Sequence, residues 1–228
     1  MKPDFVLWQQ YPICGTPMTT KHPLLPLPDY QRIYQVAYSV LETSEIAITH
    51  RACIFFAAVG TLILREHYKL PATISAGCMA IMVDEAKESV VVYGRNHNGV
   101  VGSDDKAFHA WCQCDGWLID FMAPIMGVSL REDGVLWDVP RRMLQMRLAD
   151  SKEQLNEIRH LGELYAFHDH SLTESLIDRQ SIQFEDLLNI CRTWYRRPPK
   201  PLKALMMGDT HAASKRLVAR APTIEGAW

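Results

Sequence analysis

An Asp-Gly pair at residues 115–116, flanked by β-prone runs, is the feature that most restricts the fold of this chain. An Asp-Gly pair between two strands favours a type I′ turn, whose two central residues both adopt positive φ. We therefore expect residues 108–114 and 117–120 to form the two arms of a tight antiparallel hairpin.

The register of this hairpin brings a histidine next to an aspartate. A two-residue turn places Trp111 opposite Asp120, and the same register places His109 opposite Met122. His109 then lies diagonal to Asp120 on one face, because strand side chains alternate with period two. An imidazole oriented by a carboxylate is the base of a nucleophilic triad. The missing component is a nucleophile.

Cys53 is the predicted nucleophile. It opens a segment, residues 52–68, that is apolar on nearly every face and is predicted to be a buried helix. Unpaired N–H groups and the helix dipole stabilise a thiolate in the first turn, and the Cys53 N–H is a ready oxyanion donor. His50 and Arg51 are expected to add positive potential. The alternative role is a small buried hydrophobic residue, and the hairpin favours the nucleophile.

Hydrophobic periodicity predicts the remaining elements. Helices are expected over residues 29–41, 151–161, 171–179 and 181–197, with Asp29, Ser171 and Ser181 as caps. Strands are expected over residues 73–83, 89–94 and 163–167, with a short strand or turn at 136–138 and a loop over 95–106. Within the buried helix, a stripe of small residues should let the sheet approach closely.

These elements predict one α+β domain over residues 1–228, with helices first, a central antiparallel sheet and further helices. Six prolines in residues 1–28 rule out a long helix and predict a surface arm. The domain divides into that arm, a catalytic core over residues 29–124, additional helices and strands over 125–197, and a basic, at most partly helical tail over 198–228.

Composition limits the partners. Hydrophobic residues make up 48% of the 228 and charged residues 22%, which is typical of a globular protein. No apolar run approaches the roughly 20 residues of a membrane span, and the N-terminus lacks a secretory signal. We therefore expect a cytoplasmic protein without membrane association, and six irregularly spaced cysteines fit a reducing compartment.

The net charge is −2, yet residues 191–228 carry eight Lys and Arg against two acidic residues. A basic tail is compatible with nucleic acid, membrane phosphates or the acidic remainder of the chain. No base-reading motif accompanies it, so nucleic-acid binding is not favoured.

The chain resembles the transglutaminase-like branch of the papain-like cysteine peptidase superfamily. The resemblance rests on Cys53 opening a core helix, on the run His109-Ala110-Trp111, and on Gly116-Trp117-Leu118-Ile119-Asp120 on the next strand. It covers residues 50–124. It implies a papain/transglutaminase-like core in which the Cys53 thiolate attacks an acyl group, His109 acts as base and then acid, and Asp120 holds the imidazole tautomer.

Two functions remain open. The first is a cysteine-nucleophile hydrolase or acyltransferase acting on a peptide, amide or ester. The second is a catalytically silent domain that binds a partner or has a structural role. No glycine pair precedes Cys53, which argues against acetyl transfer, and Ala47 stands where papain-type peptidases place a glutamine donor. The second oxyanion donor, the acyl acceptor and the oligomeric state are therefore unassigned.

No cofactor or metal is expected. Strand parity points Cys112 and Cys114 away from His109 and into the core. A zinc site built from these two with Cys14 and Cys78 is a weaker alternative, because the usual spacing of a ligand pair is missing. The sequence His168-Asp169-His170 is interpreted as a solvated cap region, and His97 is a weaker alternative base.

Overall fold

The computed structural model describes residues 23–97, 100–208 and 214–228. Its helices are α1 (Leu27–Ser44), α2 (Cys53–Ile63, extended by a π-helical turn over Leu64–Tyr68), α3 (Met126–Glu132), α4 (His170–Asp178) and α5 (Ile182–Trp194). Its strands are β1 (Thr73–Asp84), β2 (Ser89–Tyr93), β3 (Arg95–His97), β4 (Val100–Gly102), β5 (His109–Cys114), β6 (Trp117–Asp120), β7 (Arg142–Arg147), β8 (Leu164–His168), β9 (Leu205–Met207), β10 (Lys215–Leu217) and β11 (Gly226–Ala227).

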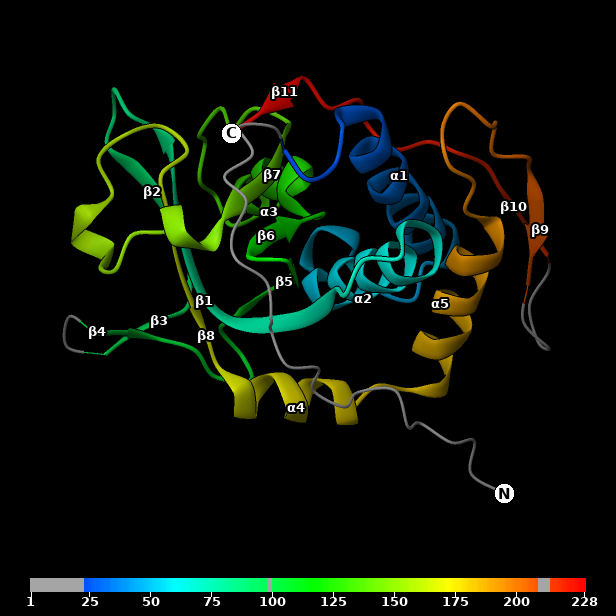
Figure 1. The fold of residues 1–228 in the computed structure, drawn as a ribbon, viewed down its shortest axis with the longest axis horizontal. Helices are drawn as coiled ribbons and strands as arrows, with labels where there is room; N and C mark the ends of the chain where they lie inside the picture. Colours follow the sequence, from blue (N-terminus) through cyan, green and yellow to red (C-terminus); the bar gives the residue numbers. More distant parts are fainter. Residues whose placement is uncertain (1–22, 98–99, 209–213) are drawn as a thin grey trace.

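A central mixed sheet is linked by strand pairing in the order β11-β7-β6-β5-β1-β2. Strand β1 pairs with β5 along its first half and with β2 along its second half, and β8 also pairs with β1. All pairs of this sheet are antiparallel except β11 with β7. Helices flank the sheet, and Figure 1 shows α1, α2 and α5 grouped together beside it. The α+β prediction is confirmed at this level.

The long strand β1 aligns the two strands that lead to the site. Met79 pairs with both β2 and β8, so these two strands lie on opposite edges of β1. Gly77 pairs with both β5 and β8, so β5 also lies opposite β8. Strands β2 and β5 therefore follow one another along the same edge of β1. The chain leaves this edge after Tyr93 and returns to it at His109.

The hairpin around Asp115 and Gly116 forms as expected, with β5 and β6 as its arms. Asp115 and Gly116 have φ of 48° and 75°, and Cys114 pairs with Trp117. The pairing stops short of the expected contact between His109 and Met122, because β6 ends at Asp120 and the chain turns there.

Helix α2 packs against the face of β5 that carries Cys112. The Cys112 Sγ lies 3.1 Å from the Ala57 carbonyl oxygen, and a Cβ at Gly60 would lie 2.7 Å from that sulfur and overlap the Phe121 ring. The small-residue stripe on α2 therefore admits the sheet as predicted, and both Cys112 and Cys114 are buried on this face.

Several local predictions were wrong. Residues 95–106 contain the hairpin of β3 and β4 instead of a loop, and residues 136–138 are neither strand nor turn. Residues 151–161 form only a short 3₁₀ turn at Leu155–Glu157. The described tail contains β9, β10 and β11 instead of helix, and β11 joins the central sheet.

Two predicted caps were also misplaced. Asp169 rather than Ser171 caps α4, since the Asp169 carboxylate accepts a hydrogen bond from the Leu172 N–H. Helix α1 begins at Leu27, so Asp29 lies in its first turn. Ser181 does cap α5. Most of the predicted arm, residues 1–22, lies outside the described residues, and none of the described helices could cross a membrane.

Candidate active site

The buried pair of His109 and Asp120 forms the base of the site. His109 Nε2 lies 2.8 Å from Asp120 Oδ2, and each residue is only 1% exposed. Asp120 ends β6 and pairs with Leu144 of β7, and His109 begins β5 and pairs with Gly77 of β1, so sheet pairing fixes both backbones. The diagonal placement inferred from the turn register is thus confirmed.

Further hydrogen bonds hold the Asp120 carboxylate and the Asp120 backbone carbonyl. The carboxylate Oδ1 accepts a hydrogen bond of 2.8 Å from the Met122 N–H, in the turn that follows β6. The Tyr30 hydroxyl of α1 donates to the Asp120 carbonyl oxygen and accepts from the Leu144 N–H. A carboxylate held at both oxygens presents one fixed edge to the imidazole.

Cys53 begins α2 and is 7% exposed. The first two N–H groups of an α-helix have no partner within the helix, and those of Cys53 and Ile54 donate to no acceptor in the described chain. His50 and Arg51, just upstream, pair with Glu132 and Asp133 at the end of α3. These pairs anchor the segment before Cys53 and offset the positive charge that was expected to act on it.

The second ring nitrogen of His109, Nδ1, is buried. Within the described chain, Nδ1 makes no hydrogen bond of ordinary geometry. Burial lowers the pKa of His109, but the Asp120 carboxylate and the Cys53 side chain raise it by more, so the pKa lies above its ordinary value. The contribution of Cys53 to this shift puts the thiol within electrostatic reach of the imidazole, although the two side chains form no hydrogen bond. Catalytic hydrogen bonds are often loose without substrate.

A tyrosine that was not predicted completes the site. The Tyr93 ring stacks on the His109 imidazole, with centroids 4.4 Å apart and planes inclined at 25°. The collinear arrangement of β2 and β5 along β1 explains the contact, since Tyr93 ends one strand and His109 begins the next. Strand periodicity alone could not reveal this pair, because fifteen residues separate them along the chain.

The other cysteines take no part in this geometry. Cys78, Cys112, Cys114 and Cys191 are buried free thiols, and burial raises the pKa of the Cys112 and Cys114 thiols to about 12. No group of three potential metal ligands occurs in the described parts of the chain. Cys14, the fourth member of the alternative zinc site, lies outside them.

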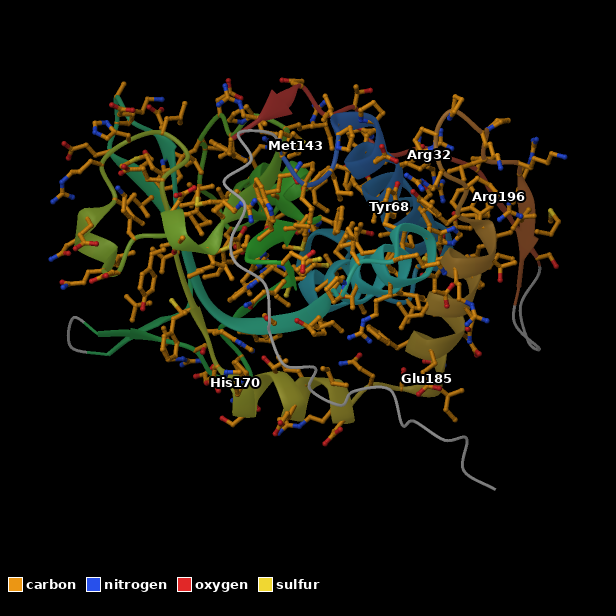
Figure 2. All side chains as sticks on the ribbon, viewed as in Figure 1. Arg32, Tyr68, Met143, His170, Glu185 and Arg196 are labelled. Carbon is orange, nitrogen blue, oxygen red and sulfur yellow. The ribbon has the colours of Figure 1, made fainter. Side chains whose placement is uncertain are left out.

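Of the other candidate histidines, His168 and His170 contact one another and form no hydrogen bond or ring contact with the triad residues within the described chain. The His168 and His170 rings are 4.1 Å apart at the start of α4, where Figure 2 labels His170. His168 Nε2 lies 3.1 Å from the Thr173 hydroxyl, and burial lowers the His168 pKa. These contacts fit the interpretation as a cap region. The side chain of His97 is not among those described.

A small surface hollow of about 100 Å³ lies elsewhere. Pro124, Arg131 and Arg141 help to line it, and no member of the triad does. Cys53 is the most exposed of the three triad residues, at 7%, and His109 and Asp120 are each 1% exposed.

Comparison with known proteins places the fold but names no activity. A family model described as "Protein of unknown function (DUF2026)" matches residues 26–228. No curated protein matches the chain. A solved structure described as "The crystal structure of genomics APC5867" is 26% identical and superposes with a TM-score of 0.78, covering 92% of this chain and all of that one.

Proposed function

The chain belongs to the DUF2026 family of proteins of unknown function, and we propose that it is a cysteine-nucleophile hydrolase or acyltransferase acting on an amide or ester. Cys53 is the nucleophile, His109 the general base and acid, and Asp120 the group that orients the imidazole. The observation that carries the proposal is the division of the His109 ring, with Nε2 bonded to Asp120 and Nδ1 buried without a partner in the described chain. The effect of Cys53 on the pKa of His109 supports the thiol as the group that Nδ1 serves.

This division determines the path of the proton. Because Asp120 occupies Nε2, the thiol proton can only pass to Nδ1. The raised pKa of His109 favours an imidazolium, whose positive charge can stabilise the sulfur anion that attacks the substrate. The carboxylate keeps the ring from rotating and stabilises its positive charge, as an aspartate does in other triads.

The reaction would proceed in two steps. The Cys53 thiolate attacks the carbonyl carbon, and Nδ1 of His109 returns the proton to the leaving amine or alcohol as the thioester forms. In the second step His109 takes a proton from water or another acceptor, which attacks the thioester and releases Cys53. The unpaired N–H groups at the start of α2 are aimed along the helix dipole and can stabilise the oxyanion of both steps.

The order of elements supports a papain/transglutaminase-like core as part of the same proposal. A cysteine begins a buried helix, a histidine begins a strand on which that helix packs, and an aspartate ends the neighbouring strand. Fold analogy contributes less than site geometry to this assignment, since one fold hosts many functions.

One observation favours a second candidate, a catalytically silent domain with a binding or structural role. His109 and Asp120 are almost fully buried, and the described hollow lies away from Cys53. A buried ion pair with no route to substrate would then only stabilise the fold.

Selective alkylation separates the two candidates. We would treat the folded Cys14→Ser variant, in which every remaining cysteine is described, with limiting iodoacetamide at pH 6–7. Peptide mapping would follow the labelling of each thiol. An activated Cys53 should react well before Cys78, whose pKa burial raises, and His109→Gln should slow Cys53 alone. Labelling of Cys53 no faster than Cys78 would favour the silent domain.

A further inference from the structure

Tyr93 lies against the catalytic base from the neighbouring strand. Tyr93 pairs with Met79 and His109 pairs with Gly77, two residues apart on β1 and therefore on the same face of it. The ring stack of 4.4 Å follows from this register.

The Tyr93 hydroxyl is buried and has no hydrogen-bond partner in the described chain. A buried hydroxyl without a partner is unfavourable relative to a bonded one. Burial and the charges of Asp120 and Cys53 raise the pKa of the Tyr93 phenol well above its ordinary value, so the phenol remains a hydrogen-bond donor. The influence of Cys53 on this phenol also places the thiol within its electrostatic reach.

We infer that the Tyr93 hydroxyl is the second oxyanion donor of the site and acts together with the Cys53 N–H. The inference rests on the proposed function, because it assigns a donor to an acyl group attached to Cys53. It accounts for a buried donor without a partner next to a triad, and for the absence of a glutamine at position 47.

The step in which Tyr93 acts is the formation of the tetrahedral intermediate. The S–C bond forms while the carbonyl π bond opens to an alkoxide, and this oxygen accepts hydrogen bonds from Tyr93 Oη and the Cys53 N–H. The carbonyl then re-forms as the bond to the leaving group breaks. Alkylation by iodoacetamide displaces iodide from a saturated carbon and creates no oxyanion, so it requires the thiolate but not Tyr93.

This difference defines the test. Tyr93→Phe keeps the ring on His109 and removes only the hydroxyl. We expect Cys53 alkylation by iodoacetamide to be unchanged, while acylation of Cys53 by 4-nitrophenyl acetate, followed as the burst of 4-nitrophenolate, slows by roughly 10²-fold. Tyr34→Phe is the matched control, because its hydroxyl is also buried and unpaired but the tyrosine packs on Phe56 in the core.

Unchanged acylation in Tyr93→Phe would overturn the inference. Equal slowing of alkylation and acylation would also overturn it, since that pattern assigns Tyr93 to positioning His109. A wild-type protein without fast alkylation would remove the proposed function and this inference with it. Thermal unfolding adds an independent check: removing an unpaired hydroxyl should not lower the melting temperature, and a clear loss of stability would show that the hydroxyl has a partner.

Discussion

Asp120 is the residue that raises the pKa of His109 most. Its carboxylate contributes both the charge and the hydrogen bond that raise the pKa of His109 against the effect of burial. A folded-state pKa above the ordinary value of about 6.5 stabilises the fold at low pH. This contribution is fully present below about pH 6.5 and is lost as the pH rises through the folded-state pKa of His109.

Asp120→Asn should therefore destabilise the protein in a pH-dependent way. Removing one partner of a buried pair costs about 3–5 kcal/mol, and we expect a larger loss at pH 6 than at pH 9. Urea unfolding at both pH values measures the difference. Asp133→Asn removes an exposed ion pair with Arg51 and should show no comparable pH dependence. Equal losses at pH 6 and pH 9 would mean that His109 is neutral across this range.

Tyr30 connects α1 to the same aspartate without touching the reacting groups. Its buried hydroxyl bridges the Asp120 carbonyl and the Leu144 N–H. Tyr30→Phe removes the buried hydroxyl that bonds to both backbone groups, and we expect a loss of about 1–3 kcal/mol in the free energy of unfolding. If the bridge also positions the carboxylate, alkylation of Cys53 should slow in the folded variant. Tyr34→Phe on the same helix removes an unpaired hydroxyl and serves as the control.

Among the elements, α2 and β5 determine the site through their close approach. Gly60 permits it, because a Cβ there would overlap the Phe121 ring, which is itself buried. Overpacking a core costs about 1–3 kcal/mol, whereas Ala in place of Gly within a helix gains only about 0.5–1 kcal/mol. The steric term is the larger one.

Gly60→Ala should accordingly lower the free energy of unfolding despite its better helix propensity. Phe121 follows Asp120 directly, so its displacement should also slow Cys53 alkylation. Gly102→Ala is the control, because nothing lies within 4 Å of a Cβ there and its φ is not positive. A stabilised Gly60→Ala variant would contradict the close packing.

The elements that were predictable from sequence are those governed by local signals. The Asp115-Gly116 turn, the apolar run of α2 and the Ser181 cap each depend on neighbouring residues alone, and each was found. The β3–β4 hairpin, α3 and β7 were missed because each element is too short to show a clear periodicity and depends on tertiary contacts. The same reason hid Tyr93, whose contact with His109 depends on a shared neighbour, β1.

In the whole molecule, residues 226–227 form the edge strand β11 of the central sheet, next to β7. Strand β11 pairs in parallel with β7, which pairs with β6 and so supports Asp120. Sequence patterns indicated only a basic tail, because a two-residue strand carries no periodicity. The tail is nevertheless part of the sheet that positions the carboxylate.

Trp228 follows β11 and holds it to β7. Its backbone N–H donates to the Met143 carbonyl at 3.0 Å, and the Arg142 guanidinium lies 5.3 Å from its ring centroid. Trp228→Ala keeps the backbone bond but removes the ring, which packs with the core on the Trp111 side of the sheet. We expect a loss of about 2–4 kcal/mol in urea unfolding, near the lower range for aromatic truncation because the ring is only partly buried. Leu136→Ala, at an 88% exposed position, should have almost no effect.

Hydrogen exchange at the β6 and β7 amides should also rise in Trp228→Ala. Unchanged exchange there would show that Trp228 does not support the strands that carry the site.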